Sequence, residues 1–169
     1  SDSQGRISAD KLAPLLSKKT KLVAFTACSN VLGGKVPVKQ IAKAAKESGA
    51  LVLVDAAQFV GHHPVDLRDW KEVDYMAFSG HKTFGPTGIG VLFHRTGAPL
   101  EPWFAGGGTV KSASLDAFEL LDHRERFEAG TPAIAEWIGL GAAIETINKI
   151  GYLAIEANEN KLVSAMLKA

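Results

Sequence analysis

The sequence contains a single cysteine, Cys28, among its 169 residues. One cysteine excludes a disulfide within the chain, and a free thiol is typical of a reducing compartment. The charge is also nearly balanced, with 19 lysine and arginine residues against 18 aspartate and glutamate residues. This balance argues against nucleic-acid and membrane-surface partners, because both attract proteins with a positive excess. We therefore expect a cytoplasmic protein that binds neither nucleic acid nor membrane.

Long apolar runs are missing as well. No stretch approaches the ~18 consecutive apolar residues that span a bilayer, so no membrane-spanning segment is predicted. Hydrophobic residues nevertheless make up 46% of the chain, which is enough for the core of a globular domain. The chain begins at Ser1 and not at a methionine, and we expect it to be part of a longer protein.

Strand-like and helix-like segments alternate along the chain. Short apolar runs typical of buried strands occur at residues 21–27, 51–54, 73–78 and 88–94. Between the first two runs, apolar residues at helical spacing begin after Pro37 and stop at Gly49. Further helices are predicted at 136–150 and 153–169. This order predicts an α/β fold with three layers, helices on both faces of a mostly parallel sheet.

Two polar residues follow the strongest strand of this series. Asp55 closes the apolar run 51–54, and Gln58 lies three residues on. The carboxyl ends of strands form the ligand crevice in α/β sheets, so a carboxylate there is well placed to bind a ligand. An aspartate that starts a turn or caps a helix would explain the same position.

A second polar segment, Ser79 to Gly90, reads SGHKTFGPTGIG and follows the strand predicted at 73–78. Its Lys82 could bind a phosphate or act as a Schiff-base nucleophile. The P-loop spacing G-x-x-x-x-G-K-[ST] is absent, and a dinucleotide fingerprint would need a glycine where Phe93 stands. Nucleotide binding is therefore disfavoured.

Schiff-base chemistry with pyridoxal 5'-phosphate needs a lysine for the aldehyde, an acid for the pyridinium nitrogen and donors for the phosphate. Lys82 can supply the amine and Asp55 the carboxylate. Ser79 and His81 can supply phosphate donors or neighbours of the ring. An ionised Asp55 would keep the ring nitrogen protonated, so that the cationic ring accepts electrons from the substrate's α-carbon.

Four ordered motifs then resemble those of one enzyme family, the class V aminotransferase-fold enzymes, and within it the cysteine desulfurase and selenocysteine lyase group. The motifs are CSNVLG at 28–33, VLVDAAQ at 52–58, SGHKTFGPTGIG at 79–90 and RFEAGTP at 126–132. The resemblance extends from about Gly5 to Gly151. It implies that residues 1–169 are a partial large domain of a type I fold pyridoxal-phosphate transferase, without its N-terminal part and its C-terminal small domain.

The resemblance also implies roles for individual residues. Lys82 would hold the cofactor covalently and later move the α-carbon proton, with His81 beside it as a second catalytic and phosphate-binding residue. Gln58 would contact the cofactor's phenolic oxygen. Asn30 would lie beside the ring, near the substrate carboxylate. Thr131 would reach the phosphate of the neighbouring subunit, which implies a homodimer.

The implied reaction takes sulfur from L-cysteine, giving alanine and an enzyme persulfide for sulfur mobilisation and iron–sulfur cluster assembly, with a possible sulfur-acceptor protein as partner. The family's persulfide cysteine and the arginine that grips the substrate carboxylate both lie outside these residues, so we expect the chain alone to be inactive. A selenocysteine lyase, another class V member and a catalytically inactive dimerisation or binding domain stay open as alternatives. Cys28 is interpreted as a packed thiol.

Adjacent histidines, His62 and His63, are the remaining candidates for a site. In extended chain they would point opposite ways. Partner ligands at metal-site spacing are missing from the sequence, so no metal site is predicted and both are interpreted as turn or packing residues.

Overall fold

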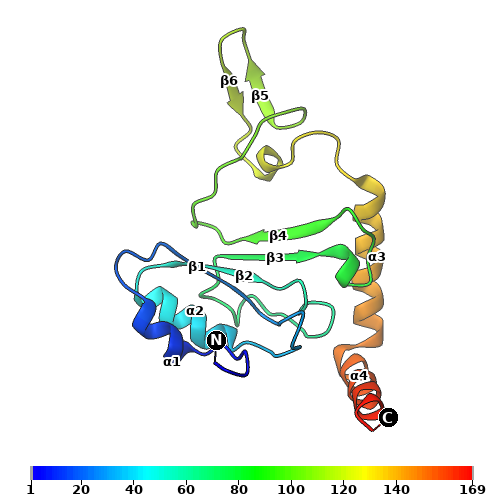
Figure 1. The fold of residues 1–169 in the computed structure, drawn as a ribbon. Coiled ribbons are helices and arrows are strands. Elements are labelled where there is room, and N and C mark those ends of the chain that lie inside the picture. The colour runs from blue at the N-terminus through cyan, green and yellow to red at the C-terminus, as the bar shows by residue number, and fades with distance from the viewer. Residues whose placement is uncertain (1, 169) are drawn as a thin grey trace. The chain divides into compact units, whose positions relative to one another are not determined.

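The computed structural model describes residues 2–168 of the chain. It divides into two compact units, Ser1–Ala98 with Glu136–Ala169, and Pro99–Ala135. The first unit contains a four-stranded sheet and the second a two-stranded hairpin (Figure 1). Within residues 2–168 no helix is long and apolar enough to cross a membrane.

The sheet has the order β1-β2-β3-β4. Its strands are β1 (Leu22–Thr26), β2 (Leu51–Asp55), β3 (Tyr75–Ser79) and β4 (Gly90–His94). The first three strands are parallel, and β4 pairs with β3 in the antiparallel direction. This mostly parallel arrangement confirms the predicted α/β fold, and all four strands fall on predicted apolar runs.

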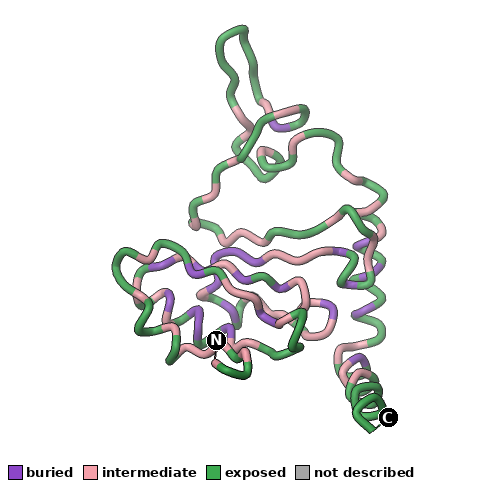
Figure 2. The backbone as a smooth tube through the Cα atoms, viewed as in Figure 1, coloured by how far each residue is buried: buried purple, intermediate pink, exposed green. Residues whose placement is uncertain are grey.

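One face of the sheet packs against α2 (Val38–Glu47), which α1 (Ala9–Leu12) and a 3₁₀ turn, η1 (Ala13–Leu15), precede in the chain. The predicted helical spacing is confirmed, because the apolar side chains of α2 are the ones that are buried. Ile41 of α2 and Val52 and Val54 of β2 are at most 1% exposed. Figure 2 shows these buried stretches in purple, and they form the core of the unit.

Two long helices follow in the chain, α3 (Ile134–Ile150) and α4 (Tyr152–Met166). Both were predicted, with bounds that differ by two residues or fewer at their N-terminal ends. Gly151 separates them with a φ of 81°, a left-handed conformation that glycine adopts without a steric penalty. The break predicted at this residue is therefore a change of direction between two helices.

The second unit consists of a hairpin, β5 (Val110–Ala113) with β6 (Phe118–Leu120), and a 3₁₀ turn, η3 (Arg124–Phe127). The sequence did not predict this hairpin. Its strands are short, and none of their residues is buried. Strands of four and three residues are too short to show clearly the alternation over about four to eight residues by which a strand is recognised.

Candidate functional site

The candidate residues of the first unit gather at the carboxyl edge of the sheet, where β1, β2 and β3 all end. Asp55 is paired in register with Thr26 on one side and with Ala77 on the other. Ser79 lies two residues beyond Ala77 on the same strand. Because side chains alternate between faces along a strand, Asp55 and Ser79 project from the same face. That face is opposite the one that packs against α2.

The carboxylate of Asp55 is exposed and oriented by its own chain. Its Oδ1 accepts a hydrogen bond from the backbone N–H of Ala57 at 2.9 Å. Its backbone carbonyl accepts one from the N–H of Ala27 at 2.8 Å, which ties the end of β2 to the end of β1. Within residues 2–168 no lysine, arginine or histidine pairs with this carboxylate. The negative charge is therefore available to a ligand.

Lys82 ends a 3₁₀ turn, η2 (Gly80–Lys82), that begins directly after β3. Thr83, which is 1% exposed, secures the turn: its Oγ1 donates to the carbonyl of Ser79 at 3.2 Å and its N–H to that of Gly80 at 2.8 Å. His81 and Lys82 are themselves exposed, and neither side chain has a hydrogen-bond partner in the described part of the chain. The buried threonine holds the backbone while the amine and the imidazole stay free.

Close backbone contacts from two glycines outside the turn hold it in place. A Cβ atom on Gly61 would lie 2.4 Å from the carbonyl oxygen of Lys82, and one on Gly85 would lie 2.9 Å from the carbonyl oxygen of Gly80. Neither distance is possible for a side chain, so glycine is required at both places. Gly61 belongs to the turn that follows β2 and also carries the half-buried Gln58. The segment with Gln58 therefore packs directly on the backbone of Lys82.

Phe84, two residues after Lys82, has a φ of 55° although it is not a glycine. The left-handed conformation costs a residue with a Cβ about 1–2 kcal/mol. The residue is 60% exposed, so burial of its side chain offsets little of this cost. Strained backbone of this kind concentrates at functional sites. Sequence reasoning missed this feature, because no residue pattern signals a strained phenylalanine.

Asn30 lies at the same edge, in the turn after β1, and its side chain is exposed. The turn is shaped by Ser29, whose Oγ accepts hydrogen bonds from the N–H groups of Val31 and Leu32 at 3.2 and 3.1 Å. Cys28, just before it, is a free and buried thiol, as predicted. Burial raises its pKa, which makes it a poor nucleophile.

Thr131 is the one candidate outside this group, because it belongs to the second unit. It is exposed and follows Gly130, whose N–H donates to the carbonyl of Gly107 at 2.8 Å. The glycine loop 106–108 therefore packs against the segment that carries Thr131.

The family model of class-V aminotransferases matches residues 1–169. A probable cysteine desulfurase of Streptomyces coelicolor is 40% identical over 97% of the chain, and the chain spans 40% of that relative. Among solved structures, the apo cysteine desulfurase of Thermococcus onnurineus NA1 matches with a TM-score of 0.92 and 43% identity, over 99% of this chain and 42% of that one. SspA in complex with cysteine matches with a TM-score of 0.69 and 30% identity, over 84% of this chain and 37% of that one.

Proposed function

Because the chain belongs to the class-V aminotransferase family, we propose that it is part of a pyridoxal-phosphate enzyme that removes sulfur from L-cysteine. One observation carries the proposal: an exposed lysine, carboxylate and imidazole share one edge of the sheet with a half-buried serine hydroxyl. The relatives named cysteine desulfurase and the cysteine complex of a similar structure support this choice of substrate.

The donor set of this edge fits the cofactor chemically. The Lys82 amine suits an aldehyde, the Asp55 carboxylate suits a pyridinium nitrogen, and Ser79 and His81 suit a phosphate. When bound, pyridoxal phosphate supplies an electron-accepting ring next to the substrate's α-carbon. Asp55 fits its partner best as an anion, and because no lysine, arginine or histidine within residues 2–168 forms an ion pair with it, that charge is left for the ring nitrogen.

The residues of the edge divide the remaining work among them. Lys82 would bind the cofactor through Nζ and, once released from it, move a proton to and from the substrate's α-carbon. His81, next to Lys82 in the chain, would assist in catalysis and contact the cofactor's phosphate. Asp55, oriented by the N–H of Ala57, would hold the proton on the ring nitrogen. Gln58, whose turn packs on Lys82, would contact the phenolic oxygen.

Substrate and subunit contacts complete the proposal. Asn30, exposed in the turn after β1, would lie near the substrate carboxylate. Thr131 would contact the phosphate bound to a second copy of the chain, so that the functional enzyme is a homodimer. The reaction breaks the bond between carbon and sulfur of L-cysteine, leaves alanine, and passes the sulfur to an acceptor thiol. Buried Cys28, with its raised pKa, is unsuited to be that acceptor, which leaves a thiol outside residues 2–168 or on an acceptor protein.

The proposal is tested by adding pyridoxal phosphate and recording the visible absorption that it gains on condensing with a lysine. We expect this band from the chain and its loss in Lys82→Ala, with Lys43→Ala, which removes an exposed lysine of α2, as the matched control. A band that survives Lys82→Ala contradicts the role of Lys82. L-cysteine is then added and alanine measured. Because the chain spans 40% of its Streptomyces relative, we expect no turnover from it alone.

A further inference from the structure

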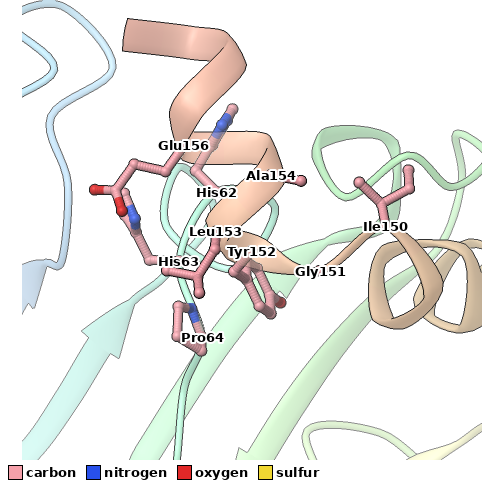
Figure 3. A pocket seen from close by; sticks show the side chains of 9 residues that line it. All are labelled: His62, His63, Pro64, Ile150, Gly151, Tyr152, Leu153, Ala154 and Glu156. Carbon is pink, nitrogen blue, oxygen red and sulfur yellow. The ribbon is translucent and has the colours of Figure 1, made fainter.

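The first half of α4 contacts the turn that follows β2 through two polar interactions. The hydroxyl of Tyr152 donates a hydrogen bond to the backbone carbonyl of Val60 at 2.9 Å. Two turns of helix further along the same face, Oε1 of Glu159 lies 2.5 Å from Nδ1 of His62. Figure 3 shows Tyr152 and His62 among the side chains of this contact. A helix more than ninety residues away in the sequence therefore binds the segment that carries Gln58.

Apolar packing is incomplete at this contact, because a cavity of about 580 Å³ opens there. His63 and Pro64 line the cavity from the turn, and Tyr152 and Leu153 line it from the helix (Figure 3). Leu153 remains 84% exposed. Where side chains do not interlock, the individual hydrogen bonds decide how firmly two segments are held.

The turn itself transmits position to Lys82. The N–H groups of Phe59 and Val60 both donate to the carbonyl of Ala56, at 2.9 and 3.1 Å, so the turn moves as one piece. Val60 is followed by Gly61, whose backbone lies against the carbonyl of Lys82 so closely that no Cβ atom fits. If Val60 is displaced, the backbone of Lys82 must therefore move with it.

We propose that Tyr152 is a positioning residue for the cofactor lysine: its hydroxyl holds Val60, and through Gly61 it fixes the backbone of Lys82. The inference rests on the proposed function, since it assigns Lys82 to the cofactor. Burial raises the pKa of the Tyr152 hydroxyl, which keeps it a proton donor at neutral pH. The phenol reaches no candidate residue itself and acts only through the turn.

The test compares Tyr152→Phe, which removes one oxygen atom, with Thr146→Val. The control removes a hydroxyl that donates to the carbonyl of Ala142 at 2.8 Å inside α3, away from the turn. Two quantities are measured: hydrogen exchange of the Phe59 and Val60 amides by NMR without cofactor, and the dissociation constant of pyridoxal phosphate from its visible band. We expect exchange about fivefold faster and binding up to about fivefold weaker in Tyr152→Phe alone, the effect of one neutral hydrogen bond.

Each outcome decides a different point. Exchange unchanged by Tyr152→Phe contradicts the tether, and faster exchange with an unchanged dissociation constant contradicts the positioning of Lys82. A wild-type chain without a lysine-dependent band contradicts the proposed function, and the positioning of Lys82 with it. If Tyr152→Phe does not fold, Glu159→Gln loosens the same turn through His62, and it must accelerate exchange of the same two amides for the inference to stand.

Discussion

Two regions of the same sheet, the face that packs against α2 and the carboxyl edge, are held by different means. The side facing α2 is held by burial, with Ile41 and Val52 at 1% and 0% exposure. The carboxyl edge is held by backbone contact, with Gly61 against the carbonyl of Lys82 and Gly85 against that of Gly80. Side chains make the first region rigid, whereas in the second region the backbone is fixed and the polar side chains stay free.

This difference teaches how a reactive edge can be both ordered and available. If the side chains of Lys82 and Asp55 held the turns together, the two charges would form an ion pair with each other and would not be available to a ligand. Glycine contacts and the buried hydroxyl of Thr83 hold the turns instead. We therefore expect core substitutions to lower stability without changing cofactor binding in the protein that remains folded. Substitutions in the glycine contacts should weaken cofactor binding more than they lower stability.

The largest effect is expected from the core. Ile41→Ala removes three carbon atoms from a fully buried side chain of α2, and such changes cost about 2–5 kcal/mol. The free energy of unfolding, measured with urea, should fall by this amount, while protein that remains folded keeps its lysine-dependent cofactor band. Ile138→Ala, at a side chain that is 70% exposed, should change little. A core variant that stays stable yet loses the band would refute the separation of the two regions.

The next effect is expected at the glycine contact. Gly61→Ala places a methyl group where 2.4 Å separates it from the carbonyl oxygen of Lys82, so the backbones must move apart. Overpacking of this kind costs about 1–3 kcal/mol. We expect a larger proportional loss in cofactor binding than Ile41→Ala causes. Gly34→Ala is the matched control, because nothing lies within 4 Å of its added Cβ. Equal cofactor binding in both glycine variants would contradict the contact.

A smaller effect is expected where α3 meets the lysine segment. Gly139→Ala and Gly141→Ala both add a methyl group to α3 and gain up to ~1 kcal/mol of helix propensity. Only at Gly139 does the new atom meet a neighbour, Pro86, at 3.1 Å. Thermal denaturation should show Gly141→Ala more stable than Gly139→Ala. The reverse order would mean that Pro86 yields without cost.

The smallest effect concerns pH. Burial, and then the charge of Lys35, lower the pKa of His63 below its ordinary value of 6.5. The unfolded chain then binds this proton more readily than the folded one, so stability is full above pH 6.5 and declines as the pH falls. His63→Gln should flatten this decline in urea titrations between about pH 7.5 and 5.5. The exposed His123→Gln should leave it unchanged, and an equal slope in all three proteins would contradict the assignment.

The sequence was sufficient to predict the elements and site residues that are marked by apolar periodicity or by a motif. The apolar spacing of α2 predicted which residues are buried, and Asp55 and Lys82 were predicted at one sheet edge because parallel strands end together. Three features of the structure could not be predicted from the sequence. The hairpin β5–β6 lacks a buried face, the strain at Phe84 has no sequence signal, and the bond from Tyr152 to Val60 joins segments whose proximity only the fold creates.

The central claim is that Lys82, and not another lysine, holds the cofactor, and mass spectrometry tests it most directly. The chain is incubated with pyridoxal phosphate, reduced with borohydride so that any lysine adduct becomes permanent, digested, and mapped. The account predicts the added mass on the peptide that carries Lys82, with exposed lysines such as Lys43 modified only at large cofactor excess. Modification spread evenly over the exposed lysines, with Lys82 no more reactive than Lys43, would contradict it.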